Sequence, residues 1–232
     1  MIDLAGRDRE VRELMDDPAA DLAALRRTYG QFRVVNRLVS GWRRHYRRDI
    51  RPLLHAERET TLLDVGCGGG DVARALAGWA ARDGLRLRVT GVDPDPRAYA
   101  YALESGSGPD VEFRCCSSTD LVAEHGRFDV VVSNHLLHHL EESELHRMLD
   151  DSLALAGRLV LHNDLTRSQV AYAAYGVVSR LAGSRSFLRT DGLRSIRRSY
   201  RPAELAAAVP QGWRVQRSFP FRLLLRREIA DG

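Results

Sequence analysis

The sequence predicts an α/β fold in which buried strands alternate with helices, and three observations support this prediction. A short apolar run at residues 60–65 stops at a cluster of glycines and passes directly into a helical pattern. A second apolar run, residues 87–92, follows that helix and ends in Asp93. A third run, residues 128–133, is apolar on both faces, as a central strand of a parallel sheet is.

Length and composition favour one domain. The chain has 232 residues, which suits a single large α/β domain, and its hydrophobic content of 44% is enough for a sizeable core. The N-terminal residues are charged rather than apolar, so we expect no signal peptide, and no apolar stretch is long enough for a membrane span. Three cysteines form no disulfide framework, so we expect a reducing, cytoplasmic environment.

The positive charge of the chain does not favour nucleic-acid binding. The formal net charge of +4 comes entirely from arginine, because the sequence contains no lysine. Arginines cluster at residues 43–48 and 197–198, but acidic residues are interspersed through the chain. The distribution of charge is therefore unlike that of a basic surface that binds nucleic acid, and a nucleic-acid partner is not favoured.

Residues 1–58 are expected to form an N-terminal helical cap. The pattern predicts helices over residues 7–15, 18–27 and 30–54. Apolar side chains recur every three or four residues from Tyr29 to Trp42 and define one face. This face either packs on the sheet or covers a bound cofactor and shapes an acceptor pocket.

The glycine cluster after the first strand predicts a cofactor-binding turn. Only one residue of the loop between strand and helix carries a Cβ, because the others are glycines: Gly66, Gly68, Gly69 and Gly70. A ligand can then lie against bare backbone amides at the start of the helix.

The second strand narrows the class of cofactor. An acidic residue in the position of Asp93 is where a ribose diol is held in an α/β unit. A nicotinamide or flavin dinucleotide is disfavoured, because Asp71 would stand in the first helical turn and repel a pyrophosphate. Asp64 and Asp71 instead suit a ligand that carries ammonium and sulfonium charges.

At this point the sequence resembles the class I S-adenosylmethionine-dependent methyltransferases, in their small-molecule branch of natural-product and quinone-type enzymes. LLDVGCGGGD, GVDPDP and FDVVVSNHLLHHL resemble three motifs of that family in the usual order, and the resemblance is close over residues 60–165. It implies a Rossmann-like sandwich with a mainly parallel seven-stranded sheet and an antiparallel last strand. It also implies one structural unit, with a methyltransferase domain at residues 59–232 and a helical lid insertion between strands five and six at about residues 166–200.

The resemblance also implies a set of residues that bind S-adenosyl-L-methionine. These are Asp64, Gly66, Gly68, Gly70, Asp93, Pro94, Ser117, Ser118 and Asn134. Many relatives end the third strand, here residues 111–115, in Gly-Asp, whereas this chain has Ser117 where the Asp is expected, so Ser117 is our first choice to contact the adenine. The segment from Tyr29 to Arg48 is similar to the cap of quinone-biosynthesis methyltransferases, which implies that Tyr29, Asn36, Ser40 and Gly41 lie near the cofactor.

Histidines after the fourth strand are the main catalytic candidates. His135 leaves the carboxyl end of that strand beside the glycine loop, and an imidazole can accept a proton from a hydroxyl at neutral pH. In the following LHHL pattern, one of His138 and His139 is expected to be a packed helix residue, and His139 is a candidate for substrate contact. The fifth strand, residues 158–161, ends in His162 and Asp164, which are alternative bases; Asp164 could equally cap the next helix.

The segment between strands five and six is expected to shape the acceptor pocket. Residues 169–182 predict an apolar helix whose Tyr172 and Tyr175 would line a site for an aromatic compound, or else form core or a dimer face. The basic residues that follow predict a mobile flap, and residues 213–218 and 221–227 predict two closing antiparallel strands.

Together these features predict a methyltransferase of secondary metabolism. We expect it to methylate a hydroxyl group of an aromatic or polyketide-like small molecule. The alternatives are carbon methylation of a quinone-like ring, an RNA methyltransferase, and a non-catalytic cofactor-binding protein. We expect no metal, and a monomer or homodimer.

Overall fold

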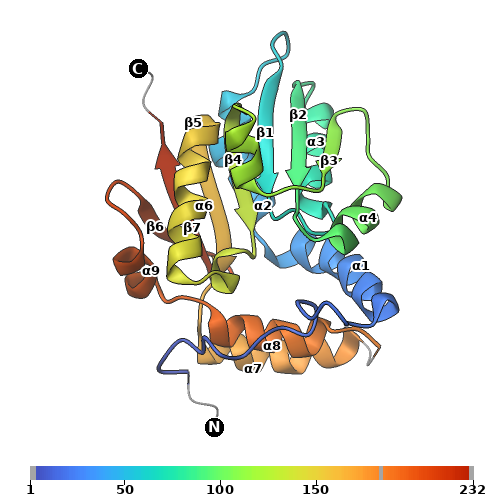
Figure 1. Cartoon of the computed structure of the whole chain (residues 1–232), viewed down its shortest axis with the longest axis vertical. Helices are drawn as coiled ribbons and strands as arrows, with labels where there is room; N and C mark the ends of the chain where they lie inside the picture. The colour runs from blue at the N-terminus through green and yellow to red at the C-terminus, as the bar shows by residue number, and fades with distance from the viewer. Residues whose placement is uncertain (1–3, 183–184, 230–232) are drawn as a thin grey trace.

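The computed structural model describes residues 4–182 and 185–229, which form a seven-stranded sheet between two layers of helices (Figure 1). The strands are β1 (Thr60–Val65), β2 (Leu87–Val92), β3 (Val111–Arg114), β4 (Phe128–Asn134), β5 (Ala156–Leu165), β6 (Arg214–Ser218) and β7 (Arg222–Glu228). Their order is β3-β2-β1-β4-β5-β7-β6, and β7 is antiparallel to both of its neighbours. The predicted Rossmann-like fold with an antiparallel last strand is thus confirmed.

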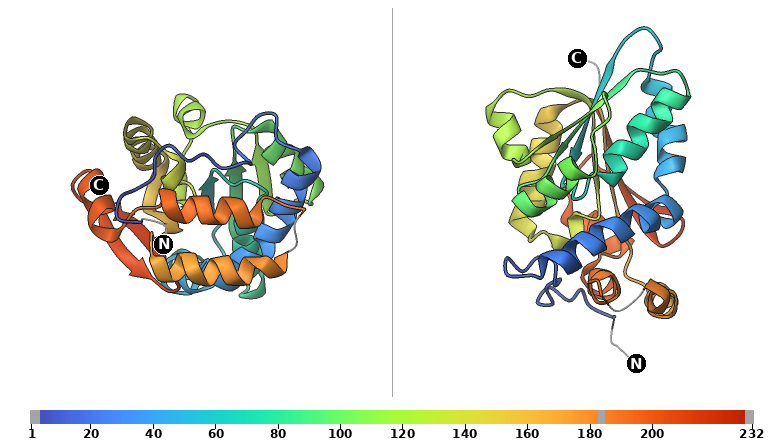
Figure 2. Two further views of the ribbon diagram at one scale, coloured as in Figure 1. Left: turned by 90° about the horizontal axis from the view of Figure 1, so that it is seen from below. Right: turned by 90° about the vertical axis from the view of Figure 1, so that its right-hand side faces the viewer.

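Helices cover both faces of the sheet. They are α1 (Leu22–Val39), α2 (Trp42–His45), η1 (Tyr46–Ile50), η2 (Arg51–Leu53), α3 (Asp71–Arg82), α4 (Pro96–Glu104), α5 (Ser118–Ala123), η3 (Leu137–His139), α6 (Glu142–Leu155), α7 (Gln169–Val178), η4 (Ser179–Ala182), α8 (Leu188–Arg198) and α9 (Pro202–Ala208). One buried cluster joins α2, η1 and α3 to one face, and a second joins α5, α6 and α9 to the other. The edge-on view of Figure 2 shows these two layers.

Parallel register brings several strand ends to one edge of the sheet. Val65 of β1 lies opposite Val92 of β2 and Ser133 of β4, and Asn134 lies opposite Asn163 of β5. α1, α7 and α8 lie across this edge, with α7 beside α8 (Figures 1 and 2). The residues after four strands therefore share one covered space. No helix of the described residues is long and apolar enough to cross a membrane.

The N-terminal segment differs from the prediction. Residues 8–20 form no helix, so the helices expected over residues 7–15 and 18–27 were wrong in this region, and α1 begins at Leu22. The segment instead crosses α8: the amides of Leu14 and Met15 donate to the Asp191 carboxylate at 2.7 and 3.0 Å. Hydrogen bonds to another element replace those that a helix would make within itself.

The expected mobile flap is also corrected. Residues 188–198 form α8, whose Leu188, Ser195 and Ile196 are buried. Its arginines do not make it a solvated turn, because Arg198 is itself buried and donates to three backbone carbonyl groups. The division into a cap of residues 1–58 and a domain of residues 59–232 stays a prediction.

Candidate cofactor and acceptor site

A cavity of about 360 Å³ lies at the carboxyl edge of the sheet. The glycine turn and Asp93 line one end of it. The rest is lined by α1, α7, α8, Arg222, the N-terminal segment and the residues that follow β4. The predicted site residues in its wall are Asp64, Gly66, Gly68, Asp93, Pro94, Asn134, His135, His139, Tyr175, Tyr29 and Asn36. The structure thus brings most of the predicted cofactor-binding residues into the wall of one cavity.

The glycine turn has the backbone geometry that requires glycine. Gly66, Gly68 and Gly70 all have positive φ, at 65°, 53° and 73°. Gly70 lies outside the cavity wall and caps α3, and a Cβ there would come within 2.3 Å of the Phe113 ring. The turn thus both exposes backbone to the cavity and packs closely on β3.

Asp93 fastens the glycine turn to the end of β2. Its carboxylate accepts hydrogen bonds from the amides of Gly68 and Asp95, each at 2.9 Å. Burial raises the pKa of Asp93. Each carboxylate oxygen has a second lone pair, so the group can still accept bonds from a ribose diol in the cavity.

Two further carboxyl groups stand beside the turn. Asp64 is 1% exposed, and neither of its carboxylate oxygens has a hydrogen-bond partner among the described residues. Its burial, and the nearby Asp71 and Asp93, raise its pKa well above the usual value. Asp71 accepts a bond of 3.0 Å from the Asn36 amide, and burial raises its pKa as well. An unpaired buried carboxyl group calls for a cationic partner.

These residues fit S-adenosylmethionine. The ribose diol would lie at Asp93, and the positive charges of the ligand would compensate Asp64 and Asp71. A pyrophosphate would meet three carboxyl groups, which is unfavourable. The acidic character of this end therefore agrees with the expectation from the sequence.

Ser117 and Ser118 lie outside the cavity wall. The Ser117 amide and hydroxyl both donate to Asp120, at 2.8 and 2.7 Å, in a capping box at the start of α5. The Ser118 hydroxyl donates to Asp151 at 2.7 Å. This geometry does not support contact between their side chains and the adenine, because each hydroxyl already serves a local bond. Ser40 and Gly41 also lie outside the wall.

His135 lies in the cavity wall in a strained conformation. Its φ is 58°, which is uncommon for a residue with a side chain, and its amide donates to the Asn163 carbonyl at 2.9 Å. Its Nε2 contacts a guanidinium nitrogen of Arg222. Burial, and then the Arg222 charge, lower its pKa well below the usual range, so the ring is neutral. Because Arg222 can only donate, Nε2 is the acceptor and Nδ1 carries the hydrogen.

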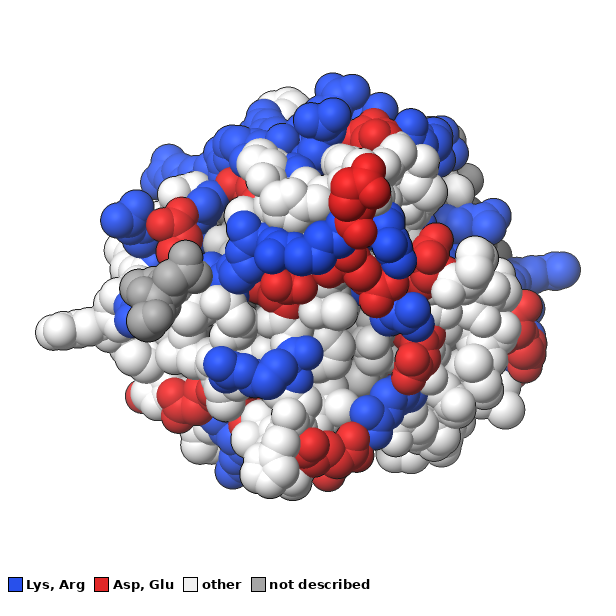
Figure 3. Space-filling model, turned by 90° about the horizontal axis from the view of Figure 1, so that it is seen from above, with Lys and Arg blue, Asp and Glu red and all other residues white. Residues whose placement is uncertain are grey.

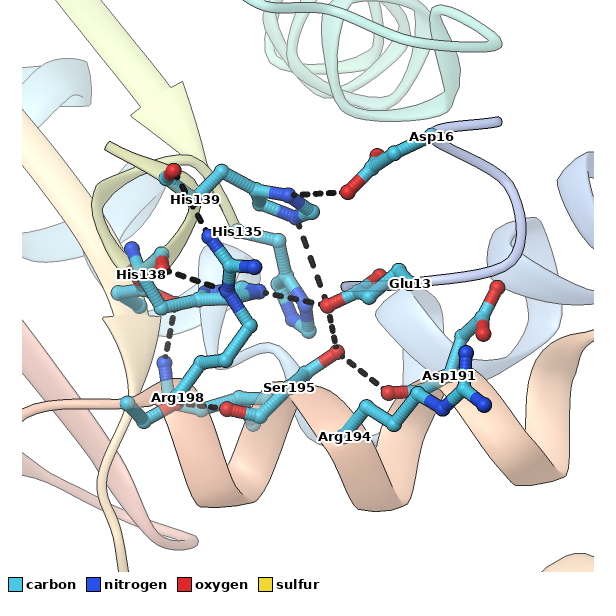
Figure 4. A network of polar contacts seen from close by, with 12 residues as sticks. Glu13, Asp16, His135, His138, His139, Asp191, Arg194, Ser195 and Arg198 are labelled. Carbon is cyan, nitrogen blue, oxygen red and sulfur yellow. Dashed lines mark hydrogen bonds and ion pairs between the residues drawn. The ribbon is translucent and has the colours of Figure 1, made fainter. Parts of the chain in front are cut away.

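His138 is the centre of a buried ion network (Figure 4). Its Nδ1 donates to Asp164 at 2.7 Å and its Nε2 donates to Glu13 at 3.2 Å. These carboxylates overcome the burial and raise its pKa to about 9. The ligand atoms of Glu13, His138 and His139 lie within 4.8 Å of one another. However, a charged imidazole whose two N–H groups are both in use does not offer a metal ligand.

Asp164 and His162 require correction as candidate bases. Asp164 accepts bonds from the His138 ring, the His138 amide and the Leu165 amide, and its pairing with His138 lowers its pKa. His162 is fully buried, contacts the Ser133 hydroxyl at 2.8 Å and packs against Trp213. Neither residue lines the cavity: His162 packs against Trp213, and Asp164 is held by His138.

Much of the remaining wall is apolar and aromatic, and Glu13, Asp16, His138 and Ser195 add polar groups to it. The apolar and aromatic part is formed by Phe32, Val35, Val39, Leu136, Leu165, Tyr175, Leu188 and Ile196. The Tyr175 hydroxyl donates to the Leu188 carbonyl at 2.6 Å, so the ring is held between α7 and α8. Tyr172 does not line the cavity. His139 does, and it contacts Asp16 at 3.2 Å.

Sequence reasoning missed Glu13, Asp16 and Arg222. Glu13 and Asp16 lie in the segment expected to be mostly helical, where nothing in the spacing placed them at the cavity. Arg222 lies in a strand of alternating pattern beside other arginines, so the local sequence does not predict that it is buried. Each reaches the site only through contacts between distant parts of the chain.

A glycine turn after β1 and an acidic residue after β2, in a sheet of this order, define a protein that binds a nucleoside-containing cofactor. Residues 62–156 match a family model described as "Methyltransferase domain". Over 117 residues the chain is 35% identical to a ubiquinone biosynthesis O-methyltransferase of Chromobacterium violaceum, covering 48% of this chain and 47% of that protein. Over 162 residues it is 30% identical to the enzyme of that name from Pseudoalteromonas translucida, covering 67% of this chain and 62% of that protein.

Solved structures share the fold across most of the chain. The plantazolicin methyltransferase BpumL, in complex with a triazolic desmethylPZN analog and SAH, matches with a TM-score of 0.60 and 12% identity, covering 93% of this chain and 92% of that one. Human N-acetylserotonin methyltransferase in complex with SAM matches with a TM-score of 0.61 and 11% identity, covering 90% of this chain and 56% of that one. The matched domain and the shared fold support a class I S-adenosylmethionine-dependent methyltransferase. It spans about half to three fifths of the length of the curated relatives reported above.

Proposed function

We propose that this protein transfers the methyl group of S-adenosylmethionine to a hydroxyl oxygen of an aromatic or polyketide-like small molecule. One observation carries the proposal: a single cavity joins the acidic glycine turn to a wall of apolar and aromatic side chains. Such a wall suits a planar, largely apolar acceptor. The two relatives are named ubiquinone biosynthesis O-methyltransferases, which supports oxygen as the methylated atom.

Positioning is the main contribution that these residues make. The bound cofactor supplies an electrophilic methyl group on a positively charged sulfur. The acceptor oxygen forms the new bond to carbon while the carbon–sulfur bond breaks, and the hydroxyl proton leaves. The glycine turn and Asp93 would hold the cofactor and the α1–α7–α8 wall would hold the acceptor, which would bring the two reactants together.

The histidines have different roles in this proposal. His138 is already protonated at neutral pH, so it holds the N-terminal segment and does not accept the acceptor proton. His135 is neutral, but its Nε2 is occupied by Arg222. Its Nδ1–H can donate to the acceptor oxygen and orient it. The hydroxyl proton then passes to solvent, because the lowered pKa of His135 makes its ring a poor base.

Cofactor binding is tested first, by calorimetric titration with S-adenosylmethionine and S-adenosylhomocysteine, with NADH as the control. We expect binding of the first two alone; binding of NADH alone would contradict the proposal. Phenols, quinones and hydroxy acids are then incubated with cofactor labelled with ¹³C in the methyl group. An O-methyl resonance supports the proposal, and a C-methyl resonance supports ring methylation instead. Cofactor binding without label transfer to any acceptor would indicate a non-catalytic protein.

A further inference from the structure

Arg222 is a buried cation in the wall of the acceptor end of the cavity. It is the first residue of β7 and is 2% exposed. In the sheet it lies opposite Leu165 of β5 and Ser218 of β6. This register places its side chain at the cavity edge of the sheet, beside the residues that follow β4 and β5.

The guanidinium of Arg222 has few partners. Its Nε donates to the Val39 carbonyl at 3.3 Å, and Nη1 donates to Nε2 of His135. No carboxylate pairs with it among the described residues, and Nη2 makes no hydrogen bond to them. Burial accordingly lowers its pKa to about 10. A buried charge without an ionic partner is costly.

Other buried arginines of this chain are satisfied. Arg167 pairs with Glu204 and also donates to the carbonyls of Leu4 and Ser199. Arg198 uses all three of its nitrogens on backbone carbonyls. Arg222 differs from both because it faces the cavity with unused donor capacity.

Asp164 acts on Arg222 electrostatically, but it makes no ion pair or hydrogen bond with it and is paired with His138 instead. Both of its oxygens are engaged by His138 and by the Leu165 amide. At the other end of the cavity, Asp64, Asp71 and Asp93 form the acidic pole. The cavity thus has one pole suited to a cation and one suited to an anion.

We propose that Arg222 forms an anion subsite and that the methyl acceptor carries an oxyanion, a carboxylate or a phenolate, that pairs with its guanidinium. The inference rests on the proposed function, since it concerns the acceptor of the same site. A planar guanidinium offers two parallel N–H groups to such an oxyanion, which would fix the orientation of the acceptor as well as its affinity.

The test measures binding of matched probes to the full-length protein saturated with S-adenosylhomocysteine, by calorimetry at pH 8. The carboxylate arm compares 3-hydroxybenzoate with 3-hydroxybenzamide. The phenolate arm compares 4-nitrophenol, which is largely ionised at this pH, with 4-nitroanisole. Arg222→Met removes the charge at similar length. Arg227→Met makes the same change on the same strand, at a residue outside the cavity wall, and is the matched control.

We expect the anionic probe to bind about tenfold or more tightly than its neutral partner in at least one arm. The preference should vanish in Arg222→Met and persist in Arg227→Met. Equal binding in both arms, or a preference that survives Arg222→Met, would overturn the anion subsite. Failure of the wild-type protein to bind S-adenosylhomocysteine would count against the proposed function instead.

A second measurement covers the case in which Arg222→Met does not fold. The wild-type protein is crystallised with S-adenosylhomocysteine and the tighter anionic probe. We expect a probe oxygen at about 3 Å from a guanidinium nitrogen of Arg222. A probe bound with its oxyanion elsewhere would contradict the proposal.

Discussion

Two buried side chains with unused hydrogen-bonding capacity, the Asp64 carboxyl group and the Arg222 guanidinium, define the two poles of the site at the level of single residues. Each is nearly inaccessible, and each faces the cavity from an opposite end. A protein keeps such groups at a cost in stability, because burying an unpaired charge is unfavourable. Ligands that bring the opposite charge recover this cost, and the poles therefore set which ligands bind.

Asp93 has a testable role in holding the cofactor. Replacing it with Ala should weaken binding of S-adenosylhomocysteine about tenfold or more, because a buried ribose diol would lose charge-assisted hydrogen bonds. Calorimetry measures this change. Asp110→Ala, at an exposed residue outside the cavity wall, is the control. Equal affinity of the Asp93 variant and the wild type would remove the assignment of the ribose to β2.

Gly70 combines two constraints that a matched pair of variants separates. Gly84 has a similar φ, 70°, but a Cβ there meets nothing within 4 Å, whereas at Gly70 it meets Phe113. Gly84→Ala should cost about 1–2 kcal/mol of unfolding free energy for the left-handed backbone alone. Gly70→Ala should cost about 1–3 kcal/mol more, for overpacking. Urea unfolding measures both, and equal losses would show that the β3 contact yields freely.

At the level of elements, one ion network joins the N-terminal segment, η3, β5 and α8. Glu13 accepts from His138 at 3.2 Å and from the Ser195 hydroxyl at 2.5 Å, and Asp164 holds His138 from below the sheet edge. Residues more than a hundred positions apart thus close one side of the cavity. Their charges, rather than helical hydrogen bonds, hold the N-terminal segment in place.

This network predicts a pH dependence of stability. The pKa of His138 is raised from 6.5 to about 9 in the folded protein. Its contribution is therefore complete below about pH 6.5 and is lost as the pH rises to about 9, with a change on the order of 3 kcal/mol. Chemical unfolding of the wild type should show this loss between those pH values and His138→Gln should not. His55→Gln, at an exposed histidine, should behave as the wild type. Parallel pH profiles of wild type and His138→Gln would refute the network.

Prediction from sequence succeeded where local pattern decides the structure. The glycine turn and Asp93 are adjacent to strands with clear apolar runs, and both lie where the pattern put them. It failed for residues 8–20, because the Asp191 carboxylate takes the amides of Leu14 and Met15. His162 and Asp164 share a strand end, but they are buried by contacts with Trp213 and His138, which spacing does not encode.

At the level of the whole molecule, charge is distributed without a continuous basic surface on the face that Figure 3 shows. That face lies opposite α7 and α8; arginine side chains gather along one margin, and acidic side chains are mixed in over the rest. We expect no binding of tRNA at 150 mM salt in a mobility-shift assay, because such binding requires many contacts between basic side chains and phosphates, which release counterions. Retained tRNA whose affinity falls steeply with salt would revive the RNA methyltransferase alternative.

Because of the position of β7, the sheet cannot be completed until the last strand of the chain has been synthesised. β7 follows every other strand in the chain, yet it lies between β5 and β6 in the sheet. Until it emerges from the ribosome, β5 has one hydrogen-bonding edge open, and open edges invite pairing with other chains. The same strand brings Arg222, so the glycine turn can form early in translation while the opposite pole of the cavity must wait for the last strand.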